Sequence, residues 1–187
     1  MTLANIMKLA LRQLDEAAED ISEYDELFKS YANMGYMIAL KLFLKPRETL
    51  TLRTDKDGCA DIGGMRISRV VEICGEEGRN VWFDLSADGG SIVTQEKEKQ
   101  LSALCEMERT PLENDMDEPD MPQWAHAALA DYICYRHLSS GNLAKQSRAE
   151  FFRQSFYQQM RALTPQGAGS VTRKKNLYAV TDARYRR

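Results

Sequence analysis

Two histidines and a cysteine in one predicted helix are the residues whose types could do chemistry. His126 and His137 are eleven residues apart, about three helical turns, and Cys134 lies three residues before His137. Thiolate and imidazole groups are ligands that zinc prefers in proteins. At about 1.5 Å per residue, however, the two histidines lie more than ~15 Å apart along the helix, too far to share one ion. We therefore expect a buried thiol and a histidine at a helix end, with no metal and no cofactor.

The sequence carries none of the short motifs that mark common enzyme sites. It contains no GxxxxGK followed by Ser or Thr, no GxGxxG after a predicted strand, and no GxSxG nucleophile elbow. Carboxylates are numerous, but they occur in runs in predicted loops, where water solvates them rather than tuning them for acid–base catalysis. We therefore predict that the protein is not an enzyme, although a small enzyme with an unrecognised site is compatible with the same sequence.

The composition is that of a soluble globular protein. Of the 187 residues, 43% are hydrophobic and 28% are charged, which excludes a mostly disordered chain, and the net charge of −3 argues against a dedicated nucleic-acid binder. Four cysteines occur without a CxxC pair, and the N-terminal residues lack the apolar stretch and cleavage site of a signal peptide. We therefore expect reduced thiols, synthesis in a cytoplasm and no membrane association.

Hydrophobic periodicity predicts helices on both sides of a β-rich stretch. Helices are expected at four places, which are residues 3–18, 22–45, 122–138 and 143–163. The second ends before Pro46, and Gly35 inside it indicates either a close helix approach or a bend. Between the two helix pairs, turn signals predict five or six short antiparallel strands.

The predicted fold class is α+β. Two N-terminal and two C-terminal helices are expected to form a four-helix bundle, with a small antiparallel β-insertion between them and an extended C-terminal tail. The predicted parts are an N-terminal helix pair at 1–46, a β-rich insertion at 47–121, a C-terminal helix pair at 122–163 and an extended tail at 164–187.

Charge is distributed unevenly along the chain. Residues 47–121 contain nine basic and eighteen acidic residues, whereas 122–163 contain five basic and two acidic, and 164–187 six basic and one acidic. The densest acidic run consists of Glu113, Asp115, Asp117, Glu118 and Asp120. Such polarity suits head-to-tail association between copies. Acidic loops that keep a protein soluble and a solvated basic tail would give the same counts.

Aromatic residues occur in adjacent pairs. The pairs are Trp82-Phe83, Phe151-Phe152 and Phe156-Tyr157. The two pairs in the last predicted helix supply more aromatic side chains than one helix face can bury, so some are expected to meet another helix or another subunit. Aromatic side chains are frequent anchors at interfaces as well as in cores.

The stretch from Asp120 to Leu163 carries a resemblance to a known family. Met121-Pro122 opens a helix, the run ALADYICY at 128–135 continues it, and a glycine-containing turn leads to a long helix with paired aromatics. With the preceding helix pair and β-insertion, this order resembles the head-to-tail adaptor (head–tail connector, or neck) proteins of tailed bacteriophages, most of all those of short-tailed phages. The β-insertion aligns with no member of the family residue by residue.

The resemblance implies a structural virion protein, located in the neck of the particle, that forms an oligomeric adaptor ring. Such rings, typically dodecamers, bind beneath the portal protein, offer a platform to tail or nozzle proteins, and extend the channel through which packaged DNA passes without sequence-specific binding. The C-terminal tail of such proteins commonly docks on the portal, which assigns portal contact to Arg173, Lys174, Lys175, Leu177, Tyr178, Tyr185, Arg186 and Arg187. Surfaces that face another subunit or the tail are expected at Trp82, Phe83, Glu113, Asp115, Asp117, Glu118, Phe151 and Tyr157.

The main alternative is a nucleic-acid-binding accessory or regulatory protein that uses the basic C-terminal tail. Against it, the rest of the chain is acidic, and the sequence contains no recognisable helix-turn-helix or RNA-binding motif.

Overall fold

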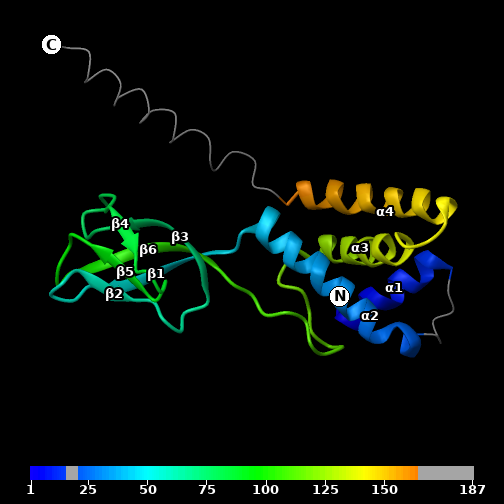
Figure 1. Cartoon of the computed structure of the whole chain (residues 1–187), viewed down its shortest axis with the longest axis horizontal. Coiled ribbons are helices and arrows are strands. Elements are labelled where there is room, and N and C mark those ends of the chain that lie inside the picture. The colour runs from blue at the N-terminus through cyan, green and yellow to red at the C-terminus, as the bar shows by residue number, and fades with distance from the viewer. Residues whose placement is uncertain (16–20, 164–187) are drawn as a thin grey trace, which may run out of the picture. The chain divides into compact units, whose positions relative to one another are not determined.

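The computed structural model describes residues 1–15 and 21–163, and these form two compact units (Figure 1). The first, called here the helical unit, contains the described residues of 1–39 and 113–163. The second, called the β unit, contains residues 40–112. Each unit has its own core.

The helical unit is arranged around one central helix. Its helices are α1 (Leu3–Leu14), α2 (Ile21–Ile38), α3 (His126–Leu138) and α4 (Leu143–Arg161), and a short 3-10 turn, η3 (Gln123–Ala125), precedes α3. The helix α3 packs against α1, α2 and α4, whereas α4 packs mainly on α3 (Figure 1). Almost the whole circumference of α3 is buried, as expected for a helix with a partner on each side.

Side-chain caps define where two of these helices begin. The Thr2 hydroxyl accepts a hydrogen bond from the Asn5 N–H at the start of α1. At the start of α4, the Asn142 side-chain oxygen accepts from the Lys145 N–H at 3.1 Å. Both caps satisfy N–H groups that have no partner inside their own helix.

The β unit consists of two three-stranded antiparallel sheets. A π-helical segment, η2 (Ala39–Leu44), leads into it. One sheet has the order β1 (Arg47–Arg53), β6 (Gln100–Met107), β3 (Ile67–Cys74), and the other the order β2 (Cys59–Asp61), β5 (Ser91–Thr94), β4 (Phe83–Leu85). Leu52 of β1 lies opposite Leu101 of β6. Together with Ile73 and Ile92 they belong to one apolar core to which both sheets contribute.

The predicted small β-insertion is wrong. The β-rich stretch is a sizeable compact unit with two three-stranded antiparallel sheets and a core of its own. The α+β class and the four α-helices among the described residues agree with the prediction, and these helices are arranged around α3. Turn spacing indicates how many strands there are, but the closing of one sheet on the other depends on contacts between residues far apart in sequence. The predicted extended tail, residues 164–187, lies outside the described residues.

No helix in residues 1–15 or 21–163 is long and apolar enough to cross a membrane.

At Gly35, the backbone of α2 lies directly against Tyr132 of α3. A Cβ atom added to Gly35 would lie 2.9 Å from Cγ and Cδ1 of Tyr132, which is closer than real Cβ contacts come. The Tyr132 ring lies at 4.9 Å, centroid to centroid, from the ring of Phe156 on α4, so it has little room to move aside. Of the two roles that the sequence indicates for Gly35, the close helix approach is confirmed.

We predict that Gly35→Ala destabilises the helical unit. Alanine favours a helix over glycine by about 1 kcal/mol, but overpacking against Tyr132 costs about 1–3 kcal/mol, so the net effect is a loss. Urea unfolding followed by circular dichroism at 222 nm measures it. Ser30→Ala, at an exposed position of the same helix, is the matched control and should change little. A Gly35→Ala protein as stable as the wild type would show that the tyrosine ring can shift without cost.

Candidate interaction surfaces

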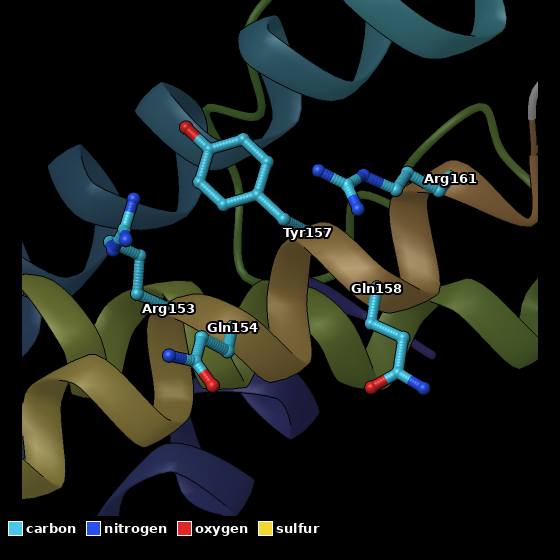
Figure 2. A pocket seen from close by; sticks show the side chains of 5 residues that line it. All are labelled: Arg153, Gln154, Tyr157, Gln158 and Arg161. Atoms are coloured by element: carbon cyan, nitrogen blue, oxygen red, sulfur yellow. The ribbon is translucent and has the colours of Figure 1, made fainter.

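The outer face of α4 is a polar and arginine-rich surface. The inner face packs on the core through Phe152, Phe156 and Met160, at spacings of four residues. On the opposite side, a groove of about 640 Å³ is lined by Arg153, Gln154, Tyr157, Gln158 and Arg161. Figure 2 shows Tyr157 standing between the two arginines, with the two glutamines along the neighbouring edge of the helix. We call these five residues the α4 face.

Arg153, Tyr157 and Arg161 form a row because they are spaced four residues apart. The guanidinium of Arg153 donates to both carboxylate oxygens of Glu150 at 2.7 Å, which lowers the pKa of Glu150 to about 2. Within the described residues, Arg161 makes no ion pair. On another side of α4, Phe151 is 67% exposed, an unusual exposure for a phenylalanine on a well-packed helix.

A second surface is the acidic loop, defined as residues 113–120. Its backbone carbonyls cap α1, because Asp117 O accepts from Leu3 N at 2.8 Å and Asp115 O accepts from Ala4 N at 3.0 Å. The carboxylate of Asp117 accepts from the N–H groups of Glu113 and Asn114, which holds the pKa of Asp117 below its usual value. The loop is therefore a folded part of the helical unit.

The acidic loop is also fastened to α2. Lys29 donates to Asp115 at 3.0 Å and to Asp25 at 2.9 Å, and these partners raise the pKa of the lysine. Between these anchor points, Met116 projects outward and is 77% exposed. A methionine held out by a fixed acidic loop is an apolar contact point with negative charge around it.

In the β unit, Trp82 is the most prominent exposed aromatic residue. Its side chain is 91% exposed next to β4, whereas Phe83 packs partly against the apolar core. Trp82 lies on the rim of a hollow of about 460 Å³ that also contains Glu77 and Glu96. The carboxylates of Glu77 and Glu96 are paired with Arg79 and Lys99 respectively, and Glu76 adds a third carboxylate to the lining.

A buried carboxylate, Asp131 of α3, connects three helices. Its Oδ1 accepts from the Gln13 amide of α1 at 3.0 Å, and its Oδ2 accepts from the Ser155 hydroxyl at 2.6 Å and the Gln159 amide at 2.8 Å, both on α4. Burial raises the pKa of Asp131, and the three hydrogen bonds oppose that rise. All three donors are neutral, so the charge is solvated by dipoles instead of a cation.

The candidate chemical residues of α3 have structural partners. The Cys134 thiol is buried and donates to the Gln13 side-chain oxygen at 3.3 Å, and burial, with the charge of Asp131 adding to it, raises the pKa of Cys134 to about 12. Such a thiol stays protonated and is not a nucleophile. His126 is buried with Nε2 at 2.8 Å from the carbonyl oxygen of Met121. His137 stacks edge-on against Phe28. Among the described residues, no group of three possible ligands could hold a metal ion.

The residues predicted for subunit or tail contact do not gather at one place. Glu113, Asp115, Asp117 and Glu118 belong to the acidic loop, Phe151 and Tyr157 to α4, and Trp82 and Phe83 to the β unit. The eight residues predicted for portal contact, Arg173 to Arg187, lie outside the described residues.

Sequence reasoning missed the two arginines of the α4 face, Met116 and the Asp131 network. The row at Arg153, Tyr157 and Arg161 has a readable signal in its four-residue spacing. Asp131 also has one, since a carboxylate within an apolar helix requires donors from the helices packed around it.

We predict that Asp131→Ala destabilises the helical unit by about 2–4 kcal/mol, because the Ser155 hydroxyl and the Gln159 amide lose their acceptor in a buried place. Asp131→Asn keeps an acceptor oxygen there and should cost less. Urea unfolding followed at 222 nm compares the two variants, and equal stability of Asp131→Ala and wild type would contradict the role given to the network.

The same pair tests the pKa of Asp131. Because the folded-state pKa is raised, the folded protein binds the proton more tightly, so this carboxyl makes the free energy of unfolding fall as pH rises from about 4 through the raised pKa. Asp131→Asn lacks that loss. The stability of Asp131→Asn relative to wild type should therefore increase with pH in this window, and a difference that is flat with pH would show that the pKa is ordinary.

No known protein family matches the chain, and no curated protein matches it at a significant level. The interaction surfaces of the helical unit are therefore the features from which a function can be argued.

Proposed function

We propose that the protein is a structural subunit of the neck of a tailed bacteriophage. In this role it forms an adaptor ring between portal and tail, joins head to tail and extends the DNA channel. The proposal starts from the resemblance of residues 120–163 to head-to-tail adaptor proteins. The observation that carries it is the pair of unlike surfaces on one helical unit, the arginine-rich α4 face and the acidic loop.

Two unlike surfaces on one rigid unit favour repeated head-to-tail contacts. When identical copies join through two different surfaces, each end of the resulting row of copies has one unoccupied surface. The row closes into a ring when the rotation between successive copies permits. The acidic loop is held to α1 by two backbone hydrogen bonds and to α2 by Lys29. The α4 face is carried by a helix of nineteen residues. Rigid surfaces of this kind suit a structural assembly.

No catalytic step is part of the proposal. The Cys134 thiol has a pKa of about 12 and is enclosed by α1 and α3. Asp131 is buried and holds its three donors in place. Packaged DNA would pass the ring without sequence-specific contacts, and the partners are the portal, tail or nozzle proteins and further copies of the chain.

A nucleic-acid-binding accessory protein is the second candidate. The observation in its favour is the row of arginines on α4, since guanidinium groups contact phosphates well. Against it, Glu150 lies on the same helix paired with Arg153, and Phe151 is exposed on another side of α4. An exposed phenylalanine and a carboxylate suit a protein partner better than a phosphate backbone.

We predict that the protein assembles into rings when it is mixed with the portal protein of its phage. Multi-angle light scattering should show a mass well above the sum of one portal ring and one free copy, and negative-stain images should show an added ring at one end of the portal. A protein that stays at monomer mass in the presence of portal would contradict the proposal.

We further predict that deletion of residues 165–187 abolishes portal binding and leaves the helical unit folded. Circular dichroism at 222 nm should be unchanged apart from the lost residues, while co-sedimentation with portal is lost. If the second candidate is correct, the same deletion instead removes an affinity for DNA that falls steeply with salt. Loss of folding on deletion would contradict the treatment of the tail as a separate part.

A further inference from the structure

We propose that copies of this chain join through the α4 face of one copy and the acidic loop of the next, with Met116 contacting the α4 face beside Tyr157. The inference rests on the proposed function only in taking self-association as the work of the protein. The two surfaces themselves come from the contacts of the helical unit.

The α4 face has the composition of a receiving surface. Arginine and tyrosine are enriched at protein interfaces, and here they alternate along one helix as Arg153, Tyr157 and Arg161. The two arginines lie eight residues apart, about 12 Å along the axis, and Tyr157 stands between them (Figure 2). The Tyr157 ring supplies the apolar area of the groove of about 640 Å³.

The acidic loop has complementary features. Met116, 77% exposed, is flanked by Asp115 and Asp117, and the side chains of Glu113 and Glu118 are exposed nearby. A methionine packs favourably against an aromatic ring, and carboxylates form strong charge-assisted hydrogen bonds with arginine. The hydrogen bonds to Leu3 and Ala4 fix the loop before it binds, so little conformational entropy is lost on association.

The two surfaces are placed so that they meet only between copies. The acidic loop contacts the start of α1 and the middle of α2, whereas α4 packs on the far side of α3 (Figure 1). Arg153 and Arg161 of α4 are exposed. One copy therefore offers an acidic surface and a basic surface on opposite sides of α3. The resulting contact is heterologous, and it propagates from copy to copy.

The test is a charge swap between two variants. Variant A carries Arg153→Glu and Arg161→Glu on the α4 face. Variant B carries Glu113→Arg, Glu118→Arg and Asp120→Arg on the acidic loop, which reverses the sign of the loop's charge. Each alone places like charges on the two surfaces that should meet. In an equal mixture, each surface of variant A faces one of opposite charge on variant B.

Sedimentation velocity at low salt, at protein concentrations up to about 1 mM, provides the readout. We expect the mass of the wild type to rise with concentration, variants A and B to remain monomers, and the mixture to regain association. Lys56→Glu with Lys97→Glu, two exposed lysines of the β unit, changes the net charge by the same amount as variant A and should associate like the wild type. Met116→Ala, which changes no charge, should weaken association by about tenfold.

Several results would overturn the inference. They are a wild type that stays monomeric over the whole range, a variant A that associates like the wild type, and a mixture that fails to associate although both variants show the wild-type circular dichroism. If variant A unfolds, Met116→Ala tests the contact instead, because truncating an exposed side chain should leave the fold intact. Association of Met116→Ala as strong as that of the wild type would then contradict the contact. If the α4 face instead binds single-stranded DNA, the wild type binds it, variant A does not, and mixing restores nothing.

The outcome for the inference is separable from that for the proposed function. Restored association in the mixture, with no binding to portal by the wild type, supports these two surfaces and contradicts the role in a phage neck. If variant A instead forms rings on portal as readily as the wild type does, the role in a phage neck is supported and the contact between these two surfaces is contradicted.

Discussion

The position of α4 depends on one buried carboxylate. Four side chains of α4 are buried against the core, a small apolar contribution for a helix of nineteen residues. Asp131 adds two hydrogen bonds to this helix, from Ser155 and Gln159, and a third to Gln13 of α1. A buried anion that loses a donor is costly, because its desolvation is then no longer offset. The network therefore selects one register of α4 on α3, and with it the direction in which the outer face of α4 points.

The acidic loop illustrates how charge and backbone geometry act together. Its carbonyl groups accept hydrogen bonds from the first N–H groups of α1. The acidic residues of the loop therefore lie near the N-terminal end of α1, where the helix dipole favours negative charge. Lys29 neutralises part of the charge and fastens the loop to α2. What the sequence presents as the end of a β-rich stretch is a structural part of the helical unit. Residues 47–112 carry nine basic and thirteen acidic residues, so the remaining five acidic residues of 47–121 belong to this loop.

Much of the secondary structure could be predicted because local rules decide it. The helix starting at Leu143 and the strands around Leu52 and Ile73 follow from hydrophobic period and turn residues. The change from α-helix to π-helix could not be predicted in this way: α2 ends at Ile38, and the chain continues as the π-helical η2 before Pro46. The closure of two sheets around one core was missed because it depends on pairs far apart in sequence. The α4 face could be predicted only in part, since the sequence predicts an interface at Tyr157 but not at the flanking arginines. Hydrophobic periodicity identifies the helix face that packs on the core and says little about the exposed face.

The placement of both surfaces on one unit has a geometric consequence for any assembly built from them. When identical copies repeat a single heterologous contact, the rotation from one copy to the next is fixed by the angle between the two surfaces on one copy. Here that angle is held at one end by the Asp131 network, which orients α4, and at the other by the hydrogen bonds of Asp115 and Asp117 to α1. A loosened network would let the angle vary, and copies would still join but would no longer return to their starting point. In an assembly built on the proposed contact, the interior carboxylate that stabilises the fold would also determine whether a chain of copies can close.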